Sequence, residues 1–272
     1  MKEIRAILFP TDFSAVANSA FPLAVRLAQG FGATVHALHV TDGGDPHITE
    51  SSRCEFPSLP AGADVRVEEA VVQQTKDPAD IIMDEAHSRE CDVIVMASHG
   101  RSEVAQFFLG RSVAERVARD SRTPTVIARL HGPRRTSRPV DRFANVVYAT
   151  DLQEHTTGIL PVASAIARQT GAKVRALLVF DEGDVRPADG GRGALERFFT
   201  RAEASDLLSS IESVRGGVGE AVVEYASANQ VDLIAITTAI CCGGDEDRTD
   251  TAEHIIRSAP CPVLCVRTEL KR

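Results

Sequence analysis

A loop with widely spaced glycines follows an apolar run in the first half of the sequence. The run VIVMAS ends at Ser98, and the segment from Ala97 to Ser112 contains Gly100 and Gly110. Glycine lets the backbone approach a ligand closely, and the N–H groups that open a helix carry partial positive charge. Because both features attract anions, this loop is expected to bind a phosphate group.

A carboxylate stands at a second place where a strand is expected to end. The apolar run AILFP, residues 6–10, is followed directly by Thr11 and Asp12. A carboxylate repels phosphate but accepts hydrogen bonds, so its natural partner is a hydroxyl donor such as a ribose. The first half therefore contains a candidate phosphate site and a candidate hydroxyl acceptor.

The elements that must position these residues alternate between strand and helix. Short apolar runs predict strands, and apolar side chains at helical spacing predict the helices between them. Ser14 is expected to cap the first helix, Gly30 with Gly32 to end it, and Pro22 to kink it without ending it. The expected strands span residues 6–10, 34–40, 64–72, 92–98 and 125–130, and the later helices span residues 78–91 and 112–121.

The order of these elements indicates where a ligand would lie. Alternating strands and helices with short connections require a parallel sheet with helices on both faces and right-handed crossovers. Such sheets bind ligands beyond the carboxyl ends of their strands, where the strand order reverses. Asp12 and the loop from Ala97 to Ser112 follow two such ends, so they are expected to face one crevice.

The second half of the chain repeats the first. Residues 11–40 align without a gap with residues 150–179, and the later segments DVIVMAS and DLIAITT also match. We therefore expect an α/β fold of two tandem Rossmann-like domains, each with a five-stranded parallel sheet flanked by helices. The expected boundaries are residues 1–130 for the first domain, 131–142 for a linker rich in Pro and Arg, and 143–272 for the second domain.

The second copy of the loop differs from the first in charge and in glycine content. The segment TAICCGGDEDRTDTAEH lacks the spaced glycines and contains Asp245, Glu246, Asp247 and Asp250. Each carboxylate close to a phosphate costs on the order of 1 kcal/mol even in a watery setting. The second domain is therefore expected to be a degenerate copy that binds no nucleotide.

Composition argues against several classes of partner. The chain has a net charge of −8, no Trp and only two Tyr, whereas nucleic-acid binding usually needs a basic surface and stacking aromatics. No apolar run approaches the ~20 residues of a membrane helix, and the first residues do not form a signal peptide. We expect a soluble cytoplasmic protein that binds neither nucleic acid nor membrane.

The six cysteines follow no regular spacing. Reduced thiols are the default for a chain with enough core to fold without disulfides. A metal or redox site at Cys241, Cys242, Cys261 and Cys265 is disfavoured, because their spacing contains no CxxC pair. No metal ligands are predicted.

The motifs FPTDFS, LHV and ASHGRSEVAQFFLGRSV resemble the universal stress protein family in its tandem form. The family's nucleotide loop reads Gly, two residues, Gly, nine residues, Gly, and then Ser or Thr. Here Ala97 replaces the first glycine, and Arg111 is inserted before Ser112. The charge of Arg111 could compensate for the insertion by pairing with phosphate.

The resemblance implies an adenine nucleotide alpha hydrolase-like version of the fold that binds ATP or a related adenine nucleotide, with or without Mg. Asp12 would lie near the nucleoside, the backbone around Val40 would contact adenine, and the loop would surround the phosphates. The implied binding residues are Thr11, Asp12, Val40, Ala97, Gly100, Arg101, Gly110, Arg111, Ser112 and Val113.

A binding role is favoured over catalysis. The chain contains no Walker loop, and no recognisable nucleophile or base is placed for phosphoryl transfer. We therefore expect a stress-response regulatory or protective factor. A slow ATPase or nucleotidyl-transfer enzyme and a nucleotide-free assembly module are the alternatives.

The assembly of the chain is expected to follow from its last strands. Residues 125–130 and the segment PVLCVR each form the final strand of a unit, where an exposed sheet edge must be covered. Pairing through these edges would make the chain an intrachain pseudo-dimer. Association into a homodimer would follow in the family's manner.

Overall fold

A computed structural model describes residues 3–41, 55–98, 112–129, 143–150, 152, 154–180, 191–240 and 246–269. The first half forms β1 (Ala6–Pro10), α1 (Ala15–Asn18), α2 (Phe21–Phe31), β2 (Thr34–Thr41), β3 (Val67–Gln73), α3 (Pro78–Ser88), β4 (Val93–Ser98), α4 (Val113–Asp120) and β5 (Thr125–Arg129). The second half forms β6 (Asn145–Thr150), η2 (Glu154–Ile159), α5 (Leu160–Thr170), β7 (Lys173–Phe180), α6 (Arg192–Arg201), β8 (Leu208–Arg215), α7 (Val218–Ala228), β9 (Leu233–Ile240), α8 (Glu246–Ser258) and β10 (Val263–Glu269).

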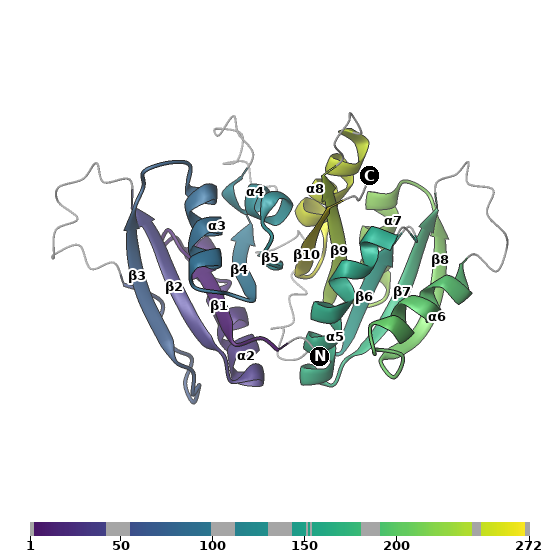
Figure 1. Ribbon diagram of the computed structural model, residues 1–272, viewed down its shortest axis with the longest axis horizontal. Coiled ribbons are helices and arrows are strands. Elements are labelled where there is room, and N and C mark those ends of the chain that lie inside the picture. The colour runs from purple at the N-terminus through teal and green to yellow at the C-terminus, as the bar shows by residue number, and fades with distance from the viewer. Residues whose placement is uncertain are drawn as a thin grey trace.

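The strands form a ten-stranded sheet in the order β3-β2-β1-β4-β5-β10-β9-β6-β7-β8. Among the described strands, neighbours within each half are parallel, and β5 and β10 are the one antiparallel pair. The two halves lie side by side in Figure 1, with β5 and β10 between them. A large, mainly parallel sheet flanked by helices confirms the predicted α/β fold class.

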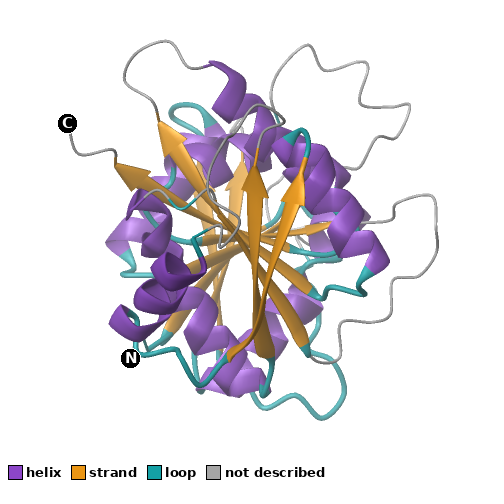
Figure 2. Cartoon of the chain, turned by 90° about the vertical axis from the view of Figure 1, so that its right-hand side faces the viewer, coloured by secondary structure: helices purple, strands orange, loops and turns teal. Residues whose placement is uncertain are grey.

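Helices cover both faces of this sheet, as Figure 2 shows. Alternate residues of β1 point to opposite faces: Ile7 and Phe9 pack in the core under α2, α5 and α6, whereas Leu8 packs in the core under α3, α4, α7 and α8. All three side chains are fully buried. This burial on both faces explains why β1 reads as a continuous apolar run.

The ends of the first helices are set by individual residues. Ser14 caps α1, with its Oγ accepting from the Ala17 N–H at 3.0 Å. Gly32 ends α2 in the left-handed conformation with φ 66°. Both confirm the sequence expectation.

The expected kink at Pro22 is wrong. The chain forms two separate helices, and α2 begins at Phe21, so Pro22 stands in the first turn. A first-turn residue has no intrahelical partner for its N–H, so proline costs nothing there. Pro161 occupies the same place in α5.

The two halves are joined about a pseudo-twofold axis. Val126 of β5 pairs with Leu264 of β10, and these two residues are equivalent in the repeat. On either side of them, Ile127 pairs with Val263 and Thr125 pairs with Cys265. The final strands therefore pair as expected from the sequence and cover each other's edges.

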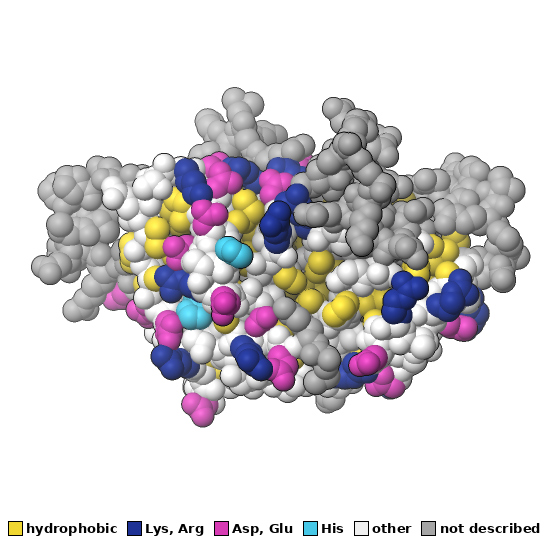
Figure 3. All heavy atoms as spheres, viewed as in Figure 1, with side chains coloured by type: hydrophobic (Ala, Val, Ile, Leu, Met, Phe, Trp, Pro, Cys, Tyr) yellow, Lys and Arg dark blue, Asp and Glu magenta, His cyan; other side chains and the backbone are white. Residues whose placement is uncertain are grey.

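Charged side chains of both signs are dispersed over the surface. On the face drawn in Figure 3, the described Lys and Arg side chains alternate with Asp and Glu and form no continuous basic patch. None of the helices in the described ranges is long and apolar enough to cross a membrane.

Candidate functional site

The turn after β1 places Thr11 and Asp12 at the carboxyl edge of the sheet. The Thr11 N–H donates to the Leu38 carbonyl at 2.8 Å, which keeps the chain paired with β2. The Thr11 Oγ1 accepts from the Phe13 N–H at 2.9 Å and lies 2.7 Å from Asn18 Oδ1, to which it donates. Thr11 is buried and Asp12 is exposed, so the hydroxyl builds the turn and the carboxylate is presented to solvent.

Asp12 also helps to hold the turn. One of its oxygens, Oδ1, accepts from the Ser14 N–H at 2.9 Å. The residue between them, Phe13, has φ 63°, a left-handed conformation that non-glycine residues rarely adopt. The second half repeats this turn, because Leu152 has φ 68° and its N–H donates to the Thr150 Oγ1 at 3.1 Å. Two copies of one strained turn mark it as a built feature of the fold.

An aromatic cluster lies beside this turn. The Phe13 ring centroid is 4.3 Å from that of His39, and Phe56 meets Phe13 edge-on at 5.1 Å. The His39 Nδ1 lies 2.9 Å from the Thr11 carbonyl oxygen, so this nitrogen carries the proton and donates. His39 precedes Val40, which is half-buried near the end of β2. Aromatic and apolar surface therefore stands next to the Asp12 carboxylate.

The end of β4 contributes a buried hydroxyl. Ala97 is half-buried and pairs with Ala128, and Ser98 is the last residue of the strand. Ser98 is only 3% exposed, and its Oγ has no hydrogen-bond partner among the described residues. A buried hydroxyl that has no partner in the described chain costs free energy, so the Ser98 Oγ at this strand end is a candidate hydrogen-bonding group for a ligand.

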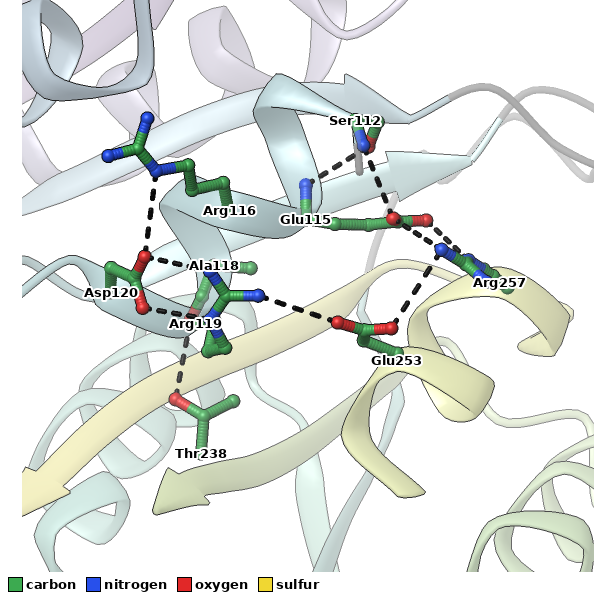
Figure 4. Close-up of polar contacts among 9 residues, drawn as sticks. All are labelled: Ser112, Glu115, Arg116, Ala118, Arg119, Asp120, Thr238, Glu253 and Arg257. Atoms are coloured by element: carbon green, nitrogen blue, oxygen red, sulfur yellow. Dashed lines mark hydrogen bonds and ion pairs between the residues drawn. The ribbon is translucent and has the colours of Figure 1, made fainter. Parts of the chain in front are cut away.

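The start of α4 presents amide groups in a fixed arrangement. Ser112 is the N-cap: its Oγ accepts from the Glu115 N–H at 3.1 Å, and the Ser112 N–H donates to Glu115 Oε2 at 3.4 Å. This reciprocal pair is a capping box, drawn in Figure 4. Val113 follows as the first helical residue and is 38% exposed. The first N–H groups of α4 are therefore held in place and oriented outward along the helix axis.

The structure brings most of the described candidates to one edge. Thr11, Asp12, Val40 and Ala97 follow or end parallel neighbouring strands, so they share the carboxyl edge. Helix α1 packs against β4, and α4 also packs against β4, which brings the Asp12 turn and the Ser112 cap to the same strand. The remaining candidates, Gly100, Arg101, Gly110 and Arg111, lie outside the described residues.

The corresponding edge of the second half is built differently. The described part of β4 ends at Ser98, whereas β9 is described past the equivalent Thr238 to Ile240 and pairs with β10 along that length. Helix α8 begins at Glu246, so only residues 241–245 connect β9 to α8, against residues 99–112 between β4 and α4. Thr238 Oγ1 donates to the Ala118 carbonyl at 3.3 Å, whereas Ser98 Oγ has no partner in the described chain.

Sequence reasoning missed three residues of the first-half edge. Phe13, His39 and Ser98 were not among the candidates, although all lie beside residues that were. The match between Ser98 and Thr238 in the repeat was a visible signal for a hydroxyl at that position. The sequence contains no such signal for the stacking of Phe13 on His39, because these two residues lie in separate segments that meet only in the folded chain.

The described cysteines do not form a site. Cys91, Cys261 and Cys265 are free and buried. Burial raises the pKa of the Cys91 and Cys265 thiols to about 12 and raises that of Cys261 as well, which keeps them protonated. In the part of the chain that the structure describes, no group of three or more His, Cys, Asp or Glu could hold a metal ion.

Comparisons with known proteins identify the repeated unit. The sequence model of the universal stress protein family matches residues 3–129 and 142–267. Universal stress protein MJ0531 of Methanocaldococcus jannaschii is 29% identical over 140 residues, which span 46% of this chain and 82% of that protein.

Two crystal structures share the whole fold. A universal stress protein from Archaeoglobus fulgidus DSM 4304 matches with a TM-score of 0.73 and 21% identity, over 98% of this chain and 97% of its own. Protein PA1789 from Pseudomonas aeruginosa PAO1 matches with a TM-score of 0.67 and 15% identity, over 97% and 93%. With its two matches to the family in tandem, this chain belongs to the universal stress protein family.

Proposed function

We propose that the N-terminal half binds one adenine nucleotide, ATP or a close relative, and that the protein is a regulatory or protective stress-response factor. The observation that carries this proposal is the buried Ser98 hydroxyl, which has no hydrogen-bond partner among the described residues; it lies at the carboxyl edge, where the exposed Asp12 carboxylate and the capped start of α4 are also found. A hydroxyl acceptor, a buried polar group and a helix N-terminus together suit a nucleoside with phosphates.

Each group has a distinct role in this proposal. The Asp12 carboxylate accepts hydrogen bonds from ribose hydroxyls, because it is acidic and exposed. The base lies toward Val40, where the rings of Phe13 and His39 add aromatic surface. The phosphates lie at the start of α4, where free amides and the helix dipole favour negative charge. The loop residues Gly100, Arg101, Gly110 and Arg111 complete the phosphate site, and Mg would accompany the phosphates.

The proposal assigns no nucleotide to the C-terminal half. There residues 241–245 alone connect β9 to α8, against residues 99–112 between β4 and α4. The same segment carries Asp245, and the first turns of α8 have Glu246, Asp247 and Asp250 in their sequence. A short connection followed by an acidic helix start is unsuited to phosphate, so this half serves the assembly of the chain.

A regulatory role follows if the nucleotide binds two arrangements of the protein with different affinity. The free buried thiols of Cys91, Cys261 and Cys265 suit a reducing compartment, and we assign the protein to the cytoplasm on that ground. Chains associate as homodimers in this proposal.

Thermal unfolding of the full chain with and without MgATP tests the proposal. A ligand at 100 times its Kd stabilises the folded state by about 2.7 kcal/mol, which raises the melting temperature. Asp12→Ala is expected to remove the shift, and Asp151→Ala, at the equivalent position of the second half, is the matched control that should keep it. No shift in the unchanged chain at millimolar MgATP would overturn the proposal.

A further inference from the structure

Two ion pairs between α4 and α8 join the two halves of the chain. Arg257 of α8 binds Glu115 of α4 through two bonds, Nε to Oε1 at 2.6 Å and Nη2 to Oε2 at 2.7 Å. Arg119 of α4 lies 3.5 Å from Glu253 of α8. In the repeat, Glu115 is equivalent to Glu253 and Arg119 to Arg257, so the pairs are related by the pseudo-twofold axis (Figure 4).

The Glu115–Arg257 pair differs from the equivalent Glu253–Arg119 pair in its position along the helix. Glu115 is the third residue of α4 and accepts from the Ser112 N–H, so its carboxylate belongs to the cap of that helix. Glu253 lies well inside α8, because α8 begins at Glu246. Only the Glu115–Arg257 pair therefore reaches the start of a helix.

This position creates an electrostatic conflict that Arg257 resolves. The Glu115 side chain is 6% exposed, so little water screens its charge. Within one turn of the α4 N-terminus, an unpaired carboxylate would oppose a bound phosphate. The bidentate guanidinium of Arg257 neutralises that carboxylate and fixes its direction, so that Glu115 can cap α4 without repelling the ligand.

We infer that Arg257, from the C-terminal half, is a positioning residue for the phosphate site of the N-terminal half and acts through Glu115. This inference rests on the proposed nucleotide binding and names the contact that makes binding depend on both halves. By linkage, a nucleotide that favours the paired Glu115 also favours docking of α8 against α4. The degenerate half would thereby sense whether the other half is occupied.

A double-mutant cycle on the full chain tests the inference. Arg257→Ala removes the bidentate partner of the Glu115 carboxylate and is expected to weaken ATP binding about fivefold, the effect of one nearby unit charge. Glu115→Gln keeps the capping oxygen but removes the charge, and is expected to bind ATP at least as tightly as the unchanged chain. In the Glu115→Gln background, Arg257→Ala should weaken ATP binding less than it does in the unchanged chain, because the part of its effect that acts through Glu115 is already gone.

Two comparisons separate this effect from general loosening of the interface. Adenosine carries no phosphate, so its affinity should be the same in the unchanged chain and in Arg257→Ala. Arg267 of β10 donates from Nη1 to the Asp120 carbonyl at 2.8 Å, at the far end of α4 from the cap. Arg267→Ala therefore loosens the interface without touching the Glu115 network and should leave ATP affinity unchanged. Arg257→Lys keeps the positive charge and should restore part of the loss.

The outcomes are distinguishable. An unchanged chain that binds no ATP would overturn the proposed function and this inference with it. An unchanged chain that binds ATP, with Arg257→Ala binding ATP equally well, would overturn the inference alone. Equal weakening of ATP and adenosine, or equal weakening by Arg267→Ala, would also overturn it, because the effect would then be structural.

Discussion

The guanidinium of Arg257 holds both carboxylate oxygens of Glu115, at 2.6 and 2.7 Å, across the boundary between the two halves of the chain. The same carboxylate accepts from the N-cap of α4. The Glu115 side chain thus caps α4 and also forms an ion pair between the two halves. Through it, the candidate ligand edge of the first half is linked to the second half.

Substitution of Glu115 is expected to separate these two roles in a stability measurement. Glu115→Ala removes the cap and the ion pair and is expected to lower the free energy of unfolding by about 1 to 3 kcal/mol. Glu115→Gln keeps a capping oxygen and should cost less. Urea unfolding of the full chain measures both values.

The control for this measurement is an ion pair at the surface. Glu3 pairs with Arg5, and their side chains are 62% and 81% exposed, so Glu3→Ala should change stability by less than about 0.5 kcal/mol. Equal losses for Glu115→Ala and Glu115→Gln would show that the cap contributes nothing.

Val113→Pro is expected to impair ligand binding while leaving the fold intact. Val113 is the first residue of α4, and Ser112 before it has φ −64° and ψ 148°, a conformation compatible with a following proline. Proline removes one N–H that would face phosphate, which should weaken ATP binding about tenfold.

Helix α3 shows that this geometry suits proline. It begins at Pro78 after the N-cap Asp77, whose φ of −54° and ψ of 132° are similar. Val113→Ala, which retains the N–H, is the matched control. Unchanged ATP affinity in Val113→Pro, measured by calorimetric titration, would argue against phosphate contact at the start of α4.

Gly32 is expected to contribute to stability through its backbone conformation alone. It ends α2 at φ 66°, and a Cβ built there would meet no atom within 4 Å. Gly32→Ala should therefore cost about 1 kcal/mol with no steric contribution, and Gly32→Asn should cost less because Asn tolerates this conformation. A loss well above 2 kcal/mol in either variant would point to a packing role for this position.

The buried thiols are expected to resist alkylation in the folded protein. Burial raises the pKa of Cys91 and Cys265 to about 12, so the reactive thiolate is scarce at pH 8. Peptide mass spectrometry after brief iodoacetamide treatment should find both residues unmodified in the native chain and modified in urea. Rapid native modification of Cys265 would contradict its placement in the core.

Much of the fold could be predicted because local signals agree with tertiary structure. Each buried strand reads as an apolar run, Ser14 and Ser112 are strong capping residues, and Gly32 supplies a left-handed helix end. Because the sequence is a repeat, the same pattern of strands and helices can be read a second time in the second half. Pro22 was misread because helical periodicity continues across the break between α1 and α2, and proline is equally compatible with a kink and with a new first turn.

The candidate site could be predicted only where it follows the ends of elements. Asp12, Val40 and Ser112 each stand at the end of a strand or at the start of a helix, so topology alone brings them toward one edge. The burial of the Ser98 hydroxyl and the ion pair of Arg257 with Glu115 depend on how distant segments pack together. Sequence spacing carries no information about such contacts.

Calorimetric titration of the full chain with MgATP, together with mass spectrometry of any small molecule that the purified protein releases on denaturation, tests the account most directly. We predict one adenine nucleotide per chain, held by the N-terminal half. If the protein releases no nucleotide and shows no heat of binding, the proposed nucleotide binding is contradicted. If two nucleotides bind per chain, the prediction that the C-terminal half binds none is contradicted.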